Sequence, residues 1–444
     1  MLKPEYIDSK AASLMERLDL STCNFTAIAA IRKDLDKAGY TQLHESEVWE
    51  IRPGGKYYLE KNSSAIFAFR IGHRSPAESG FRIIAAHSDS PCFKLKPNPE
   101  IVGDGGLISL NVEKYGGAIM YTWFDRPLSI AGRAMLRSND PLHPHTRIFD
   151  LKKPVATIPH LAIHFNRSVN EGNPLSVQKD MKPVLGHFTA EEIEESRKSG
   201  GIIRQMTASH LGVDAADILG TELCLYPIAP ATRLGAHNEY IQSARIDDLS
   251  MAFAALDALE ESDTCLHDHT CVMAIFDNEE TGSATRQGAA SPVLRNALQR
   301  ICTALDNAPD SLCRAIGRSF LISADDAHAW HPNYNEQYDP TNHPLIGEGP
   351  AIKINANCKY MTDAYGQAVF SALCEKAGVK CQTFVNHADV AGGSTLGNIL
   401  TSQLDIQGVD MGAPIWAMHS AAETAGAYDH AAICRVFATF FGES

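Results

Sequence analysis

After residue 236 the sequence alternates between short apolar strands and helices, and this alternation limits the possible fold more than any other feature. An apolar strand at 271–276 lies between helices at 249–259 and 295–305, and a strand at 320–323 precedes a helix at 364–377. Such alternation is typical of a mostly parallel sheet covered by helices. We therefore predict an α/β fold with a mixed, mostly parallel sheet and helices on both faces.

The first 91 residues have the same pattern. Apolar residues at helical spacing predict helices at 7–18 and 25–38, and a glycine follows the second of them, as at many helix ends. Short apolar runs predict strands at 56–59, 65–69 and 82–86. We expect this segment to belong to the same domain as the later alternating region.

The middle of the chain has a different pattern. Residues alternate with the two-residue period of half-exposed strands, and Thr189 with Glu192 forms a capping box at the start of a polar helix. We predict a discontinuous α/β domain, residues 1–91 and 233–444, and an inserted β-rich domain, residues 92–232. Strands of the inserted domain are expected at 108–112, 120–124, 128–130 and 159–164.

Composition excludes several classes of protein. A chain of 444 residues can form two domains. Its net charge of −14 argues against binding to nucleic acid or to an anionic membrane. The sequence has no signal-peptide pattern and no apolar run near the ~20 residues of a membrane-spanning helix. Its 11 cysteines contain no C-x-x-C pair, which favours reduced thiols in a cytoplasmic protein.

Polar clusters follow three of the predicted strands, at the sheet edge where open α/β sheets bind ligands. His87 and Asp89 end the first strand, and a neutral His beside a carboxylate is suited to bind a metal. Glu279 and Glu280 follow the strand at 271–276; one could bind a metal while the other acts as a general base. Asp325 follows the third strand.

Two further clusters allow either a structural or a metal-binding role. Asp247 precedes an apolar helix, which it could cap, or it could reach two metals at once. His419 lies between apolar and small residues and could be a core histidine. Oxygen and imidazole ligands suit zinc, manganese or cobalt, and a bridging carboxylate forms the two-metal clamp of aminopeptidases. The candidate ligands are His87, Asp247, Glu280, Asp325 and His419.

Longer motifs give the chain a family resemblance. They are Tyr115-Gly116-Gly117 and the segments 122–126, 131–133, 158–164, 277–280, 322–334 and 418–420. Over nearly its whole length the chain resembles the aspartyl aminopeptidase family of two-metal exopeptidases. The resemblance implies a catalytic domain with an inserted assembly domain, and a homo-oligomer, often a dodecamer.

The resemblance also implies a role for each candidate residue. Asp247 would bridge two divalent ions, with His87 and Asp325 completing one site and Glu280 and His419 the other. Asp89 would orient His87, and Glu279 would be the general base that acts on a metal-activated water. Residues expected to contact the substrate are Lys353, Tyr360 and His328, together with His164, which would enter a neighbouring subunit's active site.

We therefore predict an aminopeptidase that releases N-terminal residues, favouring Asp and Glu, from peptides. Two alternatives remain: a two-metal deacylase or carboxypeptidase, and a non-catalytic scaffold. Two features depart from the family pattern. Asp248 stands where Asn is usual, which adds a carboxylate near the metals, and residues 386–394 follow the family pattern only in part.

Overall fold

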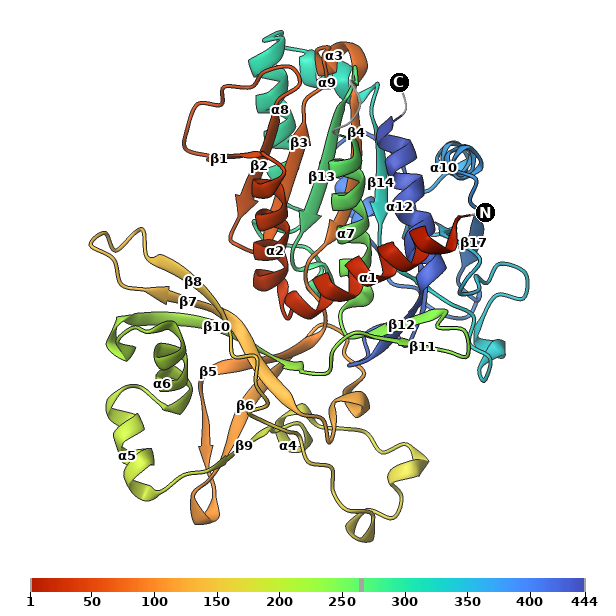
Figure 1. The fold of residues 1–444 in the computed structure, drawn as a ribbon. Coiled ribbons are helices and arrows are strands. Elements are labelled where there is room, and N and C mark those ends of the chain that lie inside the picture. The colour runs from red at the N-terminus through yellow and green to blue at the C-terminus, as the bar shows by residue number, and fades with distance from the viewer. Residues whose placement is uncertain (1, 263–266, 443–444) are drawn as a thin grey trace.

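The computed structural model describes residues 2–262 and 267–442, and its largest sheet has nine strands (Figure 1). The strand order is β1-β2-β3-β13-β4-β14-β18-β16-β17. The central neighbours β13, β4, β14 and β18 are all parallel. In chain order the nine strands are Thr41–Leu43, Lys56–Lys61, Ala65–Arg70, Phe81–His87, Thr270–Phe276, Phe320–Ala324, Ala351–Ile354, Gln382–Val385 and Gln407–Gly412.

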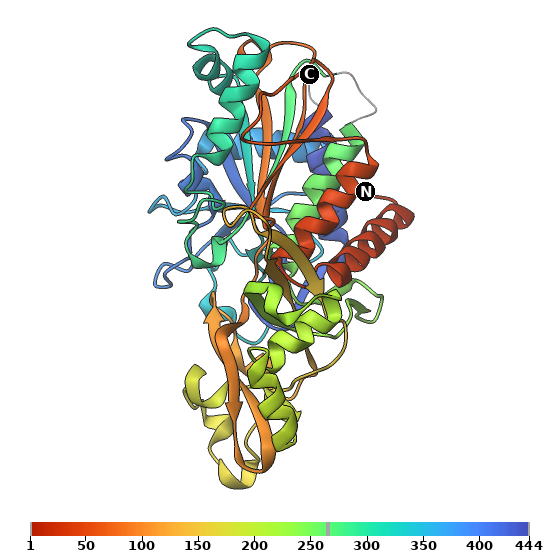
Figure 2. The ribbon, with the colours of Figure 1, turned by 90° about the vertical axis from the view of Figure 1, so that its left-hand side faces the viewer.

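Helices cover both faces of this sheet, as predicted (Figures 1 and 2). Side chains of β4 alternate between the two apolar cores: Ile84 and Ala86 face one, and Ile83 and Ala85 face the other. The first core is closed by α1 (Pro4–Leu20), α2 (Asn24–Lys37), α7 (Ile246–Glu261), α10 (Ala364–Ala377) and α12 (Ala427–Gly442). The second is closed by α8 (Val293–Leu305), α9 (Ser311–Ile316) and α11 (Leu396–Leu400), while α3 (Pro76–Ser79) leads into β4.

A second, antiparallel sheet extends away from the first (Figure 2). Its order is β8-β7-β10-β5-β6-β9. All six strands fall within the predicted inserted segment, and we retain residues 92–232 as a proposed domain. In chain order they are Cys92–Val102, Leu107–Tyr115, Leu128–Leu136, His145–Asp150, Val184–His187 and Ile218–Pro227. The accompanying helices are α4 (Val177–Asp180), α5 (Ala190–Lys198) and α6 (Ile202–Leu211); the predicted capping box at the start of α5 is confirmed.

A third sheet of five short strands joins segments that are distant in the sequence. Its order is β11-β12-β20-β19-β15. It places the segment before α7 beside the segment near the C-terminal helix, because β12 pairs with β20. In chain order the strands are Thr232–Leu234, Tyr240–Ser243, Ala327–His328, Pro414–Trp416 and Glu423–Gly426.

Two strand predictions in the middle segment were wrong. Residues 120–124 contain the 3₁₀ turn η2 (Met120–Trp123), because Trp123 turns inward and packs edge-on against Phe93 with ring centroids 5.1 Å apart. Residues 159–164 form an irregular loop that leads into η3 (Ile163–Phe165). An alternating pattern forms a strand only beside a pairing partner, and here the pairing is limited to an isolated bridge at Ile158.

Polar contacts fix the second sheet against the first part of the chain. Arg133 on β7 donates from Nη1 to the carbonyl oxygen of Asn62 (2.7 Å), and its guanidinium lies 4.7 Å from the Phe25 ring centroid. Thr22 donates to Asp150 Oδ2 at 3.0 Å. The two sheets are therefore joined by buried contacts as well as by the chain. Within the described ranges no helix is both long and apolar enough to cross a membrane.

Asp257 on α7 holds the N-terminal helix in place, and this predicts a stability effect. Its two carboxylate oxygens pair with Lys10 Nζ (2.7 Å) and Arg17 Nη1 (2.5 Å). The change Asp257→Ala removes the partner that both cations share, while each keeps another acidic partner, and should lower the free energy of unfolding by about 1.5–3 kcal/mol. Urea denaturation followed by tryptophan fluorescence measures the change. Glu195→Ala, which removes an exposed pair with Lys198, should change it by less than about 1 kcal/mol.

Candidate metal centre

The candidate site lies at the carboxyl edge of three adjacent strands. His87 is the last residue of β4. Asp325 follows β14 on one side of β4, and Glu279 and Glu280 follow β13 on the other, in the turn η7 (Glu279–Thr281). Because β13, β4 and β14 are parallel neighbours, their carboxyl ends bring these side chains together.

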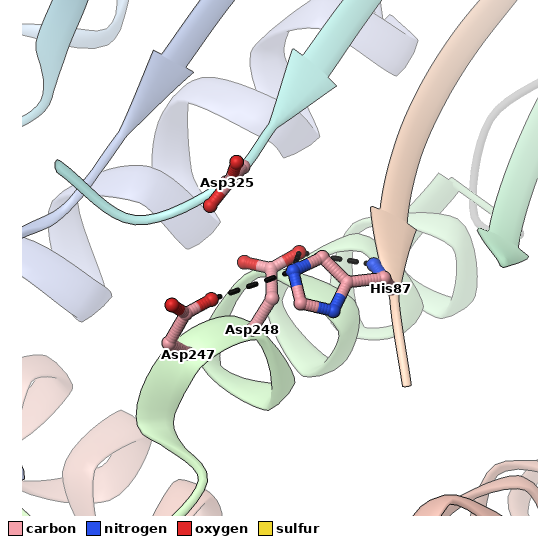
Figure 3. A group of neighbouring side chains, drawn as sticks. All are labelled: His87, Asp247, Asp248 and Asp325. Carbon is pink, nitrogen blue, oxygen red and sulfur yellow. Dashed lines mark hydrogen bonds and ion pairs between the residues drawn. The ribbon is translucent and has the colours of Figure 1, made fainter. Parts of the chain in front are cut away.

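The start of α7 supplies the fourth side of the site (Figure 3). Asp247 and Asp248 are both buried, and the main-chain nitrogen of Asp247 donates to Glu423 Oε2 at 3.1 Å. Asp248 Oδ2 accepts a hydrogen bond from the main-chain nitrogen of His87 at 3.0 Å. The unusual acidic residue at position 248 therefore reaches the site, within 4.0 Å of His87 Nε2.

Asp247 lies between two histidines from different parts of the chain. Its Oδ1 is 3.4 Å from His87 Nε2, and its Oδ2 is 3.4 Å from His419 Nε2. His419 Nε2 is also 3.2 Å from Glu280 Oε1. Two ligand atoms bound to one tetrahedral zinc at about 2.0–2.1 Å are about 3.3 Å apart. These separations are those of atoms positioned to share a metal ion.

Unsatisfied buried oxygens give an independent test of whether the residues fit a metal. Asp247 Oδ1, Asp248 Oδ1 and Glu280 Oε1 are buried and accept no hydrogen bond. Leaving such atoms without a partner is costly, and a divalent cation would satisfy them. Within the described residues, three overlapping groups have ligand atoms within 4.8 Å of one another: His87 with Asp247, Asp248 and Asp325; His87 with Glu279 and Glu280; and Asp247 with Glu280 and His419.

Burial is the main reason that the pKa values of Glu279 and Glu280 are raised, and neighbouring carboxylates add to it. Burial raises the pKa of Glu279 to about 8, and the charges of Asp325 and Glu280 add to the increase. Burial likewise raises the pKa of Glu280 to about 7, with Asp247 contributing. Carboxyl groups this close cannot all be ionised at neutral pH without added positive charge. Divalent cations would supply that charge.

Asp89 supports the glutamate turn with its side chain. Its carboxylate accepts hydrogen bonds from the main-chain nitrogens of Glu279 (3.1 Å) and Glu280 (3.2 Å) and from the Tyr115 hydroxyl (2.6 Å). The Nδ1 atom of His87 is 3.0 Å from the main-chain oxygen of Asp89 and 3.4 Å from its carboxylate. Asp89 therefore contacts His87, which it was expected to orient, and it also supports the glutamate turn.

The predicted substrate residues are divided between the site and the surface. Lys353 on β16 is buried, with Nζ 3.5 Å from Asp325 Oδ2 and 5.8 Å from the Tyr360 ring centroid. His328 on β15 is exposed, with its ring centroid 5.8 Å from that of Phe384. His164 is exposed on η3, outside the buried cluster. Lys353 thus lies beside the candidate ligand Asp325, and Tyr360 lies beside Lys353. His328 follows Asp325 by three residues in the sequence.

Sequence reasoning assigned no role to two buried acids that support the site. Glu423 accepts hydrogen bonds from the main-chain nitrogens of Asp247 (3.1 Å) and His419 (2.6 Å). Asp410 on β18 accepts from the Thr395 hydroxyl at 2.6 Å, and burial raises its pKa while the nearby Lys353 lowers it. Neither acid lies in a cluster after an expected strand. Their hydrogen bonds to other segments of the chain become visible only in the folded structure.

The fold and the site together define an α/β metallohydrolase, with carboxylates and imidazoles gathered at the carboxyl edge of the sheet. A family model described as "Aminopeptidase I zinc metalloprotease (M18)" matches residues 18–441. The chain belongs to the M18 family of zinc aminopeptidases, which are hydrolases of peptide bonds. The expected family membership and enzyme class are confirmed.

Individual relatives agree with this assignment. The chain is 44% identical over 431 residues to a probable M18 family aminopeptidase 2 of Clostridium novyi, covering 97% of this chain and 98% of the relative. It superimposes on a chain of the cryo-EM structure of the Ape4 and Nbr1 complex with TM-score 0.93 and 33% identity, covering 98% and 86% of the two chains. It also superimposes on a chain of the mApe1 dodecamer of S. cerevisiae with TM-score 0.86 and 27% identity, covering 99% of this chain and 97% of that chain.

Metal removal should destabilise the protein if these residues bind an ion. Adding Zn²⁺ to chelator-treated protein, at about 1,000 times the dissociation constant, should stabilise the fold by about 4 kcal/mol per site and raise the unfolding temperature in calorimetry. Asp247→Asn should remove most of this response, because its oxygens face both histidines. Asp104→Asn, at an exposed position, serves as the control. An unchanged response in Asp247→Asn would contradict the assignment.

Proposed function

We propose that the protein binds two divalent metal ions, zinc in the first instance, with manganese or cobalt as substitutes. Asp247 would contact both ions, with His87 and Asp325 completing one site and Glu280 and His419 the other. The observation that carries this proposal is the position of Asp247, whose two carboxylate oxygens each lie 3.4 Å from a different histidine. A carboxylate that binds a single ion has no need for such a symmetric arrangement.

We infer that peptide hydrolysis at this site uses Glu279 as the general base. When bound, the metal pair supplies Lewis-acid activation of water and of the scissile carbonyl. The Glu279 carboxylate takes the proton from the attacking water and passes it to the leaving amine. This carboxylate lies within 4.8 Å of ligand atoms of His87 and Glu280, which would put it close to a water held at the metals. Asp89 holds the main chain of Glu279 in place for this transfer.

The preference for N-terminal Asp or Glu is a finer part of the proposal. Lys353 is a buried cation beside the metal ligand Asp325, and a buried cation favours an acidic substrate side chain through charge-assisted contact. Tyr360 and His328 lie close to Lys353 or to its neighbour on β17 and complete the proposed substrate pocket. Because Asp325 already neutralises part of the Lys353 charge, the acidic preference should be moderate.

We also propose that the protein functions as a homo-oligomer in the cytoplasm. The loop that carries His164 exposes Leu161, Ile163 and Phe165, and apolar groups gathered on one loop favour burial against another chain. The structurally similar mApe1 forms a dodecamer, which we propose for this chain as well, with His164 reaching a neighbouring site. The free thiols of the described cysteines support a reducing compartment.

Replacing Glu279 tests the catalytic step. Glu279→Gln keeps the size of the side chain but removes the proton acceptor, so kcat should fall by about 10²–10⁴-fold. Metal content, measured by atomic emission after gel filtration, should stay at the wild-type value. Glu78→Gln, on the remote helix α3, is the matched control. Unchanged turnover in Glu279→Gln would exclude this residue as the base.

A substrate panel tests the reaction and its specificity. Peptides with N-terminal Asp, Glu, Leu, Lys or Ala, together with N-acyl amino acids and carboxypeptidase substrates, would be compared before and after chelation and with Zn, Mn or Co restored. We expect chelator-sensitive release of Asp and Glu to exceed release of the others. Faster release of neutral residues would contradict the proposed preference for acidic residues but would leave the aminopeptidase activity in place. Turnover only of the N-acyl or carboxypeptidase substrates, or none at all, would favour the deacylase, carboxypeptidase or scaffold alternatives.

A further inference from the structure

The turn that follows β6 brings the six-stranded sheet into direct contact with one half of the metal centre. A Cβ atom added at Gly116 would lie 3.1 Å from Glu280 Cβ, and one added at Gly117 would lie 3.1 Å from His419 Nδ1. Both separations are shorter than ordinary van der Waals contact. The main chain of this turn therefore packs against both proposed ligands of the second ion, and glycine permits the close approach.

Tyr115, the last residue of β6, connects the same turn to the glutamates. Its hydroxyl donates to Asp89 Oδ2 at 2.6 Å and accepts from Asn278 Nδ2 at 2.9 Å. Asp89 in turn accepts from the main-chain nitrogens of Glu279 and Glu280. The Tyr115 ring is itself covered by Lys94, whose Nζ lies 4.0 Å from the ring centroid. One hydroxyl thus holds both the start of the glutamate turn and the carboxylate that supports it.

The next residues of the segment hold the loop that carries His419. The main-chain nitrogen of Ile119 donates to the carbonyl oxygen of His419 at 3.0 Å. The Thr122 hydroxyl accepts from the main-chain nitrogen of Ala421 at 2.9 Å. Residues 115–122 therefore contact both the glutamate turn and the loop that carries His419, the two segments proposed to hold the second ion. His87 and Asp325, in contrast, are positioned by strands of the nine-stranded sheet.

We propose that Tyr115 is a positioning residue and that residues 115–122 hold the Glu280–His419 half of the centre, so that binding of the second ion depends on the six-stranded sheet. This inference rests on the proposed assignment of Glu280 and His419 as ligands of one ion. It assigns the six-stranded sheet a role inside the subunit's own site. A displacement of that sheet relative to the nine-stranded sheet would weaken binding of the second ion before binding of the first.

Zinc binding by two variants of the full-length protein tests the proposal. Tyr115→Phe removes the hydroxyl, and Gly117→Ala places a methyl group against the His419 ring. Chelator-treated protein would be titrated with Zn²⁺ against a chromophoric chelator, and Glu280→Gln identifies the step that belongs to the second ion. We expect both variants to weaken that step by about 10–100-fold, the usual effect of losing a group that orients a ligand, with little change in the other step.

Two matched controls separate this effect from general damage to the sheet. Tyr226→Phe removes another buried tyrosine hydroxyl of the same sheet, which donates to Asp150 at 2.5 Å. Gly220→Ala adds a methyl group at a position on β10 with no heavy atom within 4 Å. Both should keep the two wild-type binding steps, and the unfolding temperature of each metal-free variant checks folding.

The possible outcomes distinguish this inference from the proposed function. In one outcome, the wild-type protein binds zinc in two steps and Glu280→Gln loses one of them. If that step is unchanged in Tyr115→Phe and Gly117→Ala, the inference is overturned and the two-metal assignment stays intact. Equal weakening of both steps would also overturn it, since the effect would not be confined to the second ion. A wild-type protein without a step that depends on Glu280 would overturn the ligand assignment and this inference together.

Discussion

Repulsion among buried carboxylates is the constraint on which the rest of this structure depends. Asp247, Asp248 and Asp325 are buried, and the half-buried Glu279 and Glu280 lie near them together with two imidazoles. Charges of one sign separate unless the surrounding chain opposes their repulsion. The protein does so with hydrogen bonds from its main chain. Each acid lies beside a strand end or a helix start, where main-chain nitrogens are fixed, and Asp89 and Glu423 accept hydrogen bonds from several of them. Divalent cations would neutralise the negative charge that remains.

The order of the strands explains why residues so far apart in the sequence meet. The three central strands β13, β4 and β14 are parallel neighbours, so the residue that follows each one emerges at the same edge. Helix α7 packs across this edge, and its first turn completes the cluster with two further acids. Because the strands are buried on both faces, the sheet is a rigid platform. The spacing between His87 and Asp325 is then set by the strand separation of the sheet.

Much of this arrangement could be predicted from the sequence, and the exceptions have a common physical cause. Short apolar runs predicted the central strands, and polar clusters after them predicted residues that the structure brings together, among them His87, Asp325 and Glu280. The wrong strand at 120–124 is a 3₁₀ turn, in which Trp123 is buried against Phe93 and both Met120 and Phe124 pack against the same core. Glu423 and Asp410 could not be identified, because their roles depend on pairing between segments that are distant in the sequence. Local pattern shows where a strand ends, but not which distant main-chain nitrogen will lie beside it.

The two halves of the centre are supported differently, and this difference has a consequence for how they bind metal. His87 and Asp325 extend from adjacent strands of the large sheet, so displacing them requires distortion of a close-packed core. Glu280 and His419 lie in turns, and those turns are held by a segment of the other sheet. Contacts between sheets are fewer than contacts within one, so the second half can move at a lower free-energy cost. Asp247 faces both halves, and Asp89 contacts both His87 and the glutamate turn, so such a displacement would reach the first half through these two carboxylates. The second sheet therefore acts directly on the Glu280–His419 half and only indirectly, through shared carboxylates, on the His87–Asp325 half.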